Sequence, residues 1–374
     1  MTHKKYRKIL VTGGAGFIGS FLVDELVKLG YQVRILDNLE DQVHQGKKPK
    51  YLNRNAEFIK GDVRKISDLK RSIDRVDAVF HLAAAVGVGQ SNYQIKKYVD
   101  TNIGGTVNLL ELLINTQHQI KKLITISSMT GYGEGNYFCK KDNIVRPPLR
   151  EEKRLREKDW NLYCPKCNGE VTPFPTDETA LDFPNSIYGL SKKNQQDMVF
   201  LIGKLYNIPT TVLRGFNIYG PRQSLSNPYT GVTAIFISRL KNDKPAVIFE
   251  DGLQTRDFVS VHDVINAFIL ALEEDKANYQ LFNIGSGKGT TILEIAQTIS
   301  SLLEKKDLID INQDFRKNDI RHCFADISKV ERLLDWKPKI SLEKGLKELI
   351  EWSGNEVAED KFSKAQQQLK SYGL

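Results

Sequence analysis

The stretch that decides the fold is "KILVTGGAGFIGSFLVDELVKLGYQVRILDN", residues 8–38. It predicts a short strand ending at Val11, a glycine-rich turn, an amphipathic helix over about 18–29 and a second strand over 33–36. Three glycines punctuate the turn: Gly13, Gly16 and Gly19. The first permits a tight turn, the second lets a pyrophosphate approach the backbone, and the third lets helix and strand pack closely. The free N–H groups of the first helical turn then face the phosphates.

A carboxylate at the end of the second strand strengthens this interpretation. Asp37 stands where it can accept a hydrogen bond from a ribose 2′-hydroxyl. Glu40 and Asp41 follow, and no arginine stands beside them to meet a 2′-phosphate. The sequence therefore predicts a dinucleotide site that favours NAD over NADP.

Strands and helices continue to alternate after this unit. Strands are predicted at 56–63, 77–84 and 122–128, with helices at 66–73 and about 94–115. This alternation predicts an α/β fold with a doubly wound parallel sheet, whose ligands bind at the carboxyl ends of the strands. Five residues stand at those ends: Gly13, Asp37, Asp62, Ala83 and Ser128. Asp62 is suited either to an adenine amine or to capping the next turn.

Length and charge limit the class of protein. The chain has 374 residues with 40% hydrophobic content, enough for one two-lobed unit or two domains. Its 54 basic and 46 acidic residues leave a small excess without a basic arm, which favours a solvated surface over nucleic-acid binding. No secretory signal and no apolar run of about 18 residues is present, so we expect a cytoplasmic protein without a membrane partner. Four cysteines in a reducing compartment favour metal binding or burial over a disulfide.

Tyr188 and Lys192 carry the predicted chemistry. They are four residues apart at the start of a predicted helix, so they share one face. A nearby ammonium, together with an oxidised nicotinamide, stabilises phenolate, and we expect the tyrosine pKa to move down so that Tyr188 acts as a base. Ser128 ends a strand that leads to the same edge of the sheet.

Together these motifs resemble the extended short-chain dehydrogenases/reductases of the NAD-dependent nucleotide-sugar epimerase and dehydratase family. The resemblance runs from Lys8 to about Pro338, interrupted by one insert, through "VTGGAGFIG", "HLAA", "TNIGGTVNLLE", "YGLSK", "LRGFNIYGPRQ", "QTRDFVSVHDV" and "FRKNDIRHCFADISK". It implies a Rossmann NAD-binding lobe over 1–219 and a smaller α/β substrate-binding lobe over 220–374, with about 255–273 returning to the first. It also implies a homodimer.

The resemblance implies roles for individual residues. The catalytic residues are Ser128, with Ser127 a less favoured neighbour, Tyr188 and Lys192. Cofactor contacts fall on Gly13, Gly16, Phe17, Ile18, Gly19, Asp37, Asn38, Asp62, Val63, Leu82, Ala83, Ala84, Asn102, Tyr188 and Lys192. Contacts to a nucleotide-sugar substrate fall on Ser128, Asn217, Arg256 and Arg316. Arg316 falls where the family holds the diphosphate, for which a guanidinium fork is suited.

The residues after Ser128 bear on the reaction. Dehydratases of this family place Asp and Glu there, whereas Met129 and Thr130 cannot transfer the proton. A reductase often prefers NADPH, against which the acidic "LDNLED" argues. We therefore expect epimerisation, most simply at C4: Tyr188 removes a hydroxyl proton, hydride passes to NAD, and it returns to the other face of a 4-keto sugar.

Several hypotheses about the substrate and about the class of protein stay open. The substrate that the resemblance implies is a dTDP-6-deoxyhexose such as dTDP-L-rhamnose. The alternatives are a UDP-glucose or UDP-N-acetylglucosamine 4-epimerase, or a dehydratase or reductase of the same family. An NAD-binding or zinc-ribbon nucleic-acid-binding protein without turnover is the alternative of a different class.

The insert falls at about 137–172 and contains "CPKC". It resembles the two-armed Cys-x-x-Cys insert of dTDP-L-rhamnose 4-epimerases, except that Asp142 stands in place of a cysteine. Cys139, Cys164 and Cys167 with Asp142 can form a tetrahedral zinc site. Four thiolates are commoner in structural zinc sites, and a vestigial, metal-free ribbon is the alternative. We expect the insert to form one wall of the sugar pocket, and Cys323 to lie in the core.

Overall fold

A parallel sheet of seven strands organises the computed structural model, which describes residues 5–374. The first four residues of the predicted first lobe lie outside the described residues. The strand order is β14 (Gln280–Ile284), β9 (Thr210–Gly215), β5 (Lys122–Ser128), β4 (Ala78–His81), β1 (Lys8–Thr12), β2 (Gln32–Asp37) and β3 (Glu57–Lys60). All neighbouring pairs run parallel, which confirms the predicted α/β fold class.

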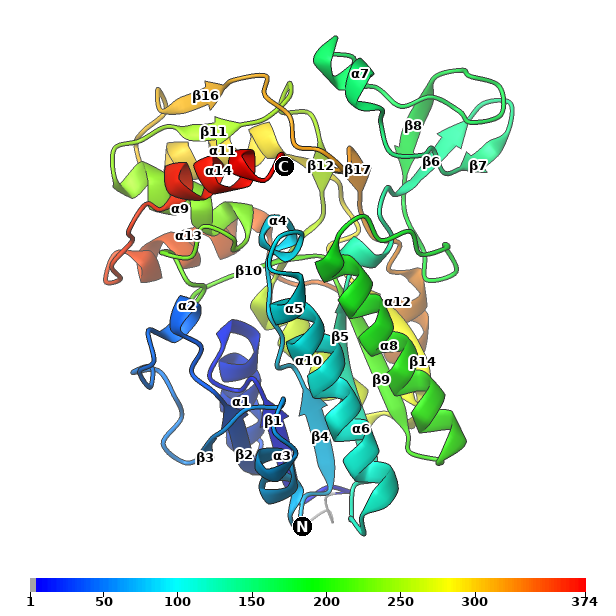
Figure 1. Ribbon diagram of the computed structural model, residues 1–374, viewed down its shortest axis with the longest axis vertical. Helices are drawn as coiled ribbons and strands as arrows, with labels where there is room; N and C mark the ends of the chain where they lie inside the picture. Colours follow the sequence, from blue (N-terminus) through cyan, green and yellow to red (C-terminus); the bar gives the residue numbers. More distant parts are fainter. Residues whose placement is uncertain (1–4) are drawn as a thin grey trace.

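Helices cover both faces of this sheet (Figure 1). On one face α3 (Ile66–Ile73), α6 (Gly105–Asn115) and α8 (Ile187–Leu205) share a core with the strands. On the other face α1 (Phe17–Lys28), α10 (Val261–Glu273) and α12 (Ser328–Leu334) form the second core. Because each helix buries one apolar stripe against the sheet, the arrangement is doubly wound.

The strand order reverses between β1 and β4, and this reversal places the site. Thr12 pairs with Leu36 on one side and with His81 on the other, so the carboxyl ends of β1, β2 and β4 are level. Loops on either side of the reversal lead to opposite faces and leave a crevice between them.

The predicted helix over about 94–115 is interrupted. It consists of α5 (Ile95–Tyr98), a π-helical segment η1 (Val99–Gly104) and α6. The neighbouring short elements are α2 (Asp41–His44), α4 (Val88–Ser91) and η2 (Met129–Gly131). A π-helical turn inserts an extra residue into a helix and is frequent at functional sites.

The second half of the chain builds a smaller lobe with its own core. Its main elements are α9 (Val232–Lys241), β11 (Ala246–Ile248), α11 (Ile292–Leu302), β16 (Ile309–Ile311), α13 (Leu342–Ser353) and α14 (Phe362–Ser371). Short elements join the lobes: β10 (Asn217–Tyr219), β12 (Thr255–Arg256), β13 (Phe258–Ser260), β15 (Thr290–Thr291) and β17 (His322–Cys323). The short η3 (Asp275–Ala277) instead packs on α10 and α12 beside the large sheet. More of this half joins the sheet than residues 255–273, because β14 and α12 also belong to it.

The insert stands apart from the sheet, beside β12 and β17 (Figure 1). It contains β6 (Asn136–Cys139), β7 (Asn143–Val145), α7 (Glu152–Arg156) and β8 (Val171–Phe174), with the strands in the antiparallel order β7-β6-β8. Its core consists mainly of five buried residues: Tyr137, Cys139, Val145, Leu162 and Cys164. Across the described part of the chain, no helix has the length and apolar character needed to cross a bilayer.

Candidate active site

A cavity of about 650 Å³ opens at the carboxyl ends of the strands, between the two lobes. Every site residue predicted from the sequence lines it except Asn102, the insert's cysteines and Asp142. The glycine turn, Ser128, Tyr188 and Lys192 therefore share one cavity with Asn217, Arg256 and Arg316. A cavity of this volume is in the range of small-molecule and cofactor sites.

The glycine turn presents bare backbone to this cavity. Gly13 has φ +70°, and a Cβ there would lie 2.8 Å from the backbone nitrogen of Ala83. A Cβ at Gly19 would lie 2.2 Å from the carbonyl oxygen of Gly13. Gly16 precedes α1, whose first turn has no acidic residue to compete for its N–H groups. The turn thus fits the pyrophosphate of a dinucleotide.

Two carboxylates flank the expected adenosine end. Asp37 accepts hydrogen bonds from the N–H groups of Ala15 (3.0 Å) and Leu39 (2.9 Å), which hold it at the end of β2. Asp62 is occupied by Arg64 and Asn38, at 2.6 and 3.1 Å. Burial raises the pKa of Asp62, but these hydrogen bonds prevail and lower it to about 2. Asp62 also accepts from the backbone N–H of Arg64, at 2.9 Å, so it caps the next turn as the alternative predicted, while Lys65 directly precedes α3.

Asn102 lies behind the cavity wall. Its side chain is fully buried in η1 and binds both the N–H (2.7 Å) and the carbonyl (3.1 Å) of Ala85. It also donates to the hydroxyl of Ser191 on α8, at 2.9 Å. The structure gives this residue a supporting position, holding the loop after β4 against α8.

Ser128, Tyr188 and Lys192 come from β5 and the first turns of α8. Ser186 caps α8 by accepting from the N–H of Gly189 (3.1 Å), and the hydroxyl of Ser91 accepts from the N–H of Tyr188 (3.0 Å). The Ser128 hydroxyl accepts from the hydroxyl of Thr130, at 3.0 Å. The ring of Tyr188 packs edge-on against Tyr98, with centroids 6.3 Å apart.

Burial governs the ionisation of this group. It lowers the pKa of Lys192 to about 7 and raises the pKa of Tyr188, against which the hydrogen bond with Ser128 acts. The Lys192 ammonium donates to the side chain of Gln195. The expected fall in the tyrosine pKa is thus absent from the chain alone, because desolvation outweighs the effect of its neighbours.

The cations of the second lobe differ in how they are held. The four terminal N–H groups of Arg256 bind Asp319 (2.9 Å) and the carbonyls of residues 255, 320 and 321. Arg316 stacks on Phe249 at 4.4 Å and makes no side-chain hydrogen bond or ion pair within residues 5–374. The buried amide oxygen of Asn217 likewise has no hydrogen-bond partner among the described residues. An unpaired guanidinium on a cavity wall is suited to a phosphate.

Comparison with known proteins identifies the family. The model of the NAD dependent epimerase/dehydratase family matches residues 9–154, and that of GDP-mannose 4,6 dehydratase matches 166–349. The dTDP-L-rhamnose 4-epimerase of Burkholderia thailandensis is 35% identical over 94% of this chain and 96% of its own length. The chain belongs to the NAD-dependent epimerase/dehydratase family. It is therefore an enzyme that works with NAD, as predicted.

Solved structures of other epimerases have the same fold. The UDP-glucose 4-epimerase of Thermotoga maritima, solved with UDP-glucose, matches with a TM-score of 0.76 and 34% identity over 92% of this chain and 98% of its own. The UDP-glucuronic acid 4-epimerase of Bacillus cereus, solved with UDP-glucuronic acid and NAD, matches with a TM-score of 0.75 and 30% identity over the same shares.

The epimerase/dehydratase cavity also has walls that sequence reasoning missed. These are the loop over residues 222–233 and α14, whose Gln366 and Leu369 line it. The loop lies within and after the quoted motif "LRGFNIYGPRQ", which pointed to it, whereas nothing in the sequence of α14 did. Gln195, which holds Lys192, was missed as well.

The insert lies elsewhere than expected. None of residues 133–184 lines the larger cavity, so the insert does not form its wall. Leu155, Arg156 and Lys158 instead line a neighbouring cavity of about 350 Å³, which shares Phe249 and Arg316 with the larger one.

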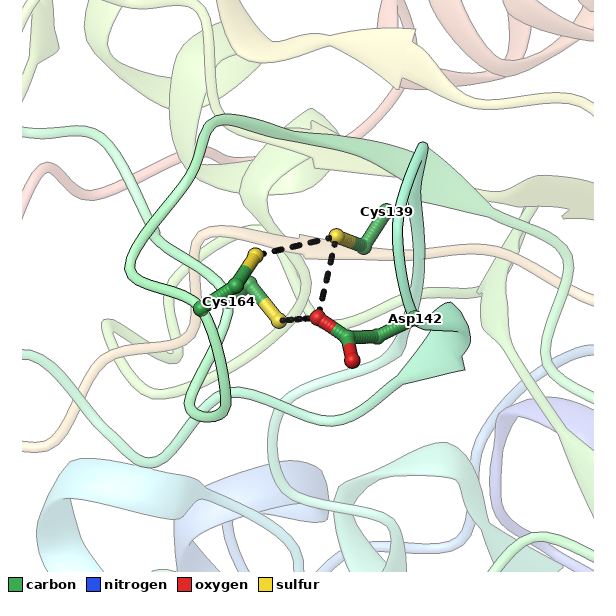
Figure 2. Close-up of side chains that lie close together, drawn as sticks. Cys139, Asp142 and Cys164 are labelled. Atoms are coloured by element: carbon green, nitrogen blue, oxygen red, sulfur yellow. Dashed lines mark hydrogen bonds between the residues drawn. The ribbon is translucent and has the colours of Figure 1, made fainter.

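The insert's cysteines gather around one carboxylate. The side chains of Cys139, Asp142 and Cys164 point toward one another (Figure 2). The sulfur of Cys139 lies 3.6 Å from that of Cys167 and 3.6 Å from Asp142 Oδ2, and Cys164 Sγ lies 3.1 Å from the same oxygen. All four ligand atoms lie within 4.8 Å of one another. Ligand atoms around a tetrahedral zinc ion stand about 3.5–3.8 Å apart, so the cluster can hold such an ion. Cys323 is buried in the core, as expected.

Proposed function

We propose that this protein is an NAD-dependent epimerase that inverts the C4 carbon of a nucleotide-diphosphate sugar. One observation carries the proposal: a serine, a tyrosine and a lysine line the same cavity as a dinucleotide turn and an unpaired arginine. A sugar held by its diphosphate at Arg316 would extend from the second lobe toward Tyr188. Bound NAD supplies the acceptor and donor of hydride.

Each residue of the chain has a distinct task in this proposal. Tyr188 holds the proton exchanged with the sugar hydroxyl, and Ser128 hydrogen-bonds that hydroxyl and orients it. The ammonium of Lys192 stabilises the phenolate form of Tyr188. Asn217, whose buried amide oxygen lacks a partner, fits a hydroxyl of the substrate.

The side chains after Ser128 favour epimerisation over dehydration. Met129 is buried, and the Thr130 hydroxyl donates to Ser128, so neither is placed to act as acid and base. Removal of water needs such a pair, whereas epimerisation needs only the tyrosine proton relay and a keto sugar free to turn.

For the substrate we propose a dTDP-6-deoxyhexose such as dTDP-L-rhamnose, supported by the full-length similarity to the Burkholderia enzyme of that name. UDP-glucose, favoured by the similarity to the Thermotoga enzyme, and UDP-N-acetylglucosamine are the alternatives. Incubation with dTDP-, UDP-, GDP- and CDP-sugars, followed by NMR, tests this. Inversion of dTDP-L-rhamnose at C4 is expected. Inversion of a UDP-sugar alone would replace the substrate, and a lack of inversion across the panel would overturn the function.

We also propose that the insert holds one structural zinc ion through Cys139, Asp142, Cys164 and Cys167. The insert's core has few residues, and three of the four ligands belong to this core or pack against it. Such a core is too small to hold the three short strands of the insert together without a further constraint. Structural zinc sites contribute folding energy directly.

A homodimer is the remaining proposal. Apolar side chains are exposed along η1–α6 and along α8, which lie side by side (Figure 1). They are Val99 and Val107 on the first, and Leu190, Leu201 and Leu205 on the second. If two copies pack these surfaces against each other around a twofold axis, η1–α6 and α8 of both copies form a four-helix contact.

A further inference from the structure

Buried ion pairs attach the insert to the second lobe. Arg150 of the insert makes two parallel hydrogen bonds to Glu250, at 2.7 and 2.8 Å, and their side chains are 1% and 3% exposed. Arg321 binds the same Glu250 at 2.8 Å and Asp251 at 2.7 Å. Buried charges are tolerated only when they are paired and hydrogen-bonded, so this geometry is strongly constrained.

The same attachment holds the backbone of residues 319–322. The carbonyl of Asp319 accepts from Arg150, at 3.2 Å. Glu134, 5% exposed, accepts from the N–H groups of Arg321 (2.9 Å) and His322 (2.8 Å). The hydroxyl of Tyr137, on the first strand of the insert, donates to Glu134 at 2.5 Å.

Arg256 binds this segment, and Arg316 is linked to it. Arg256 donates to the side chain of Asp319 (2.9 Å) and to the carbonyls of Ile320 (2.8 Å) and Arg321 (3.1 Å). The N–H of Asp319 donates to the carbonyl of Arg316, at 3.3 Å. Arg256 and Arg316 therefore depend on a segment that the insert and Glu134 hold from outside the cavity.

We propose that Arg150 and Glu134 are positioning residues for the nucleotide diphosphate. They set the place of residues 319–322, and this segment sets the place of Arg256 and Arg316 on the cavity wall. The insert would thus control substrate affinity without touching the substrate. The inference rests on the proposed function, since Arg316 is taken to bind the diphosphate and Arg256 to line the same substrate site.

The test compares Arg150→Ala with Lys153→Ala in the full chain loaded with NAD. Lys153 lies three positions further along the insert, on α7, is exposed and makes no ion pair within the described residues. Binding of UDP, dTDP, GDP and CDP is measured by calorimetry, and the tightest binder of the wild type serves as the probe. Displacement of Arg316 would weaken its charge-assisted hydrogen bonds to the diphosphate, so we expect Arg150→Ala to weaken binding of the probe about tenfold or more.

Three further readouts separate positioning from a general loss of structure. With a sugar substrate, KM should rise while kcat changes little, because Ser128, Tyr188 and Lys192 lie on β5 and α8. The NAD content should stay at the wild-type value. Arg150→Lys should show a smaller loss, since an ammonium keeps the charge but cannot form two parallel bonds to Glu250. If Arg150→Ala does not fold, the diphosphate affinity of Arg150→Lys tests the inference by itself.

Unchanged diphosphate affinity in Arg150→Ala and Arg150→Lys would overturn the inference, as would an equal loss in Lys153→Ala or a parallel loss of NAD. Diphosphate binding requires no turnover, so a sugar panel without inversion leaves this test valid. If no nucleoside diphosphate binds the wild type, the proposed function and this inference fail together.

Discussion

At the scale of single residues, burial sets the chemistry more strongly than sequence spacing does. Tyr188 and Lys192 share a helix face as their spacing predicts, yet the Lys192 ammonium binds Gln195 and desolvation dominates both pKa values. A lysine with a pKa near 7 is easily switched between charged and neutral forms. The charge of Lys192 and that of a bound, oxidised nicotinamide then set how readily Tyr188 releases its proton.

Tyr188→Phe should lower turnover by roughly two to four orders of magnitude, because the ring is kept but the general acid–base group is lost. NAD content and nucleotide-sugar affinity should stay near the wild-type values, since the ring still packs on Tyr98. Tyr206→Phe, the same change at the other end of α8, is the control and should leave turnover unaffected. Turnover of Tyr188→Phe close to the wild type would contradict the assigned role.

His81 should make the folded protein sensitive to acid. It is fully buried between the hydroxyls of Thr12 (2.9 Å) and Thr106 (3.0 Å), and burial, with the charge of Lys192, lowers its pKa from 6.5 to about 3. Below pH 6.5 the unfolded chain binds a proton that the folded chain does not. The free energy of unfolding should therefore decrease as the pH is lowered below 6.5, by up to about 1.4 kcal/mol per pH unit for this residue.

Urea unfolding at about pH 6 and pH 5 measures this slope, because an unfolded histidine is mostly protonated across that interval. In His81→Gln the change in unfolding free energy per pH unit should be smaller, by the amount that corresponds to about one proton bound on unfolding. Equal slopes in the variant and the wild type would show that His81 titrates normally in the folded state.

At the scale of elements, the insert shows how a small unit is stabilised at both ends. Its strands gather the four candidate zinc ligands at one end, while Arg150 and Glu134 make the buried contacts to the second lobe at the other. Elements with such small cores usually need a metal, a disulfide or a large contact to remain folded.

Replacing Cys164 and Cys167 by serine should release zinc and raise KM for the sugar nucleotide, while NAD stays bound because its turn lies on another element. Elemental analysis of protein purified without chelator, with NAD absorbance measured in parallel, checks both statements. Cys323→Ser, a change at a buried cysteine outside the cluster, is the control for metal content. A wild type without metal and a double variant with unchanged kinetics would remove zinc from the proposal.

At the scale of the whole molecule, both lobes contribute to one cavity. The exposed apolar surface along η1–α6 and α8 lies outside that cavity. Leu201 and Leu205 are 59% and 64% exposed. If this surface is the contact between copies, Leu201→Glu should convert the dimer to a monomer, as measured by light scattering. Leu181→Glu, on an equally exposed leucine of a loop, should not. A wild-type monomer at micromolar concentration would contradict the homodimer.

The sequence by itself determined the local units of this protein. The glycine turn with Asp37, and Tyr188 with Lys192, depend on residues a few positions apart, whose geometry follows from strand and helix periodicity. The fold class followed because alternating strands and helices admit few arrangements.

Only the tertiary structure decided how distant segments meet. Strands β9 and β14 are fully or largely buried and short, so they carry no period that marks them as sheet strands. Asn102 lies behind the wall rather than on it, because an interrupted helix turns it toward Ala85 and Ser191. Arg150 meets Glu250 across 100 positions of sequence, and Arg256 meets Asp319 across 63. Such contacts depend on how segments far apart in the sequence pack together, which neighbouring residues do not encode.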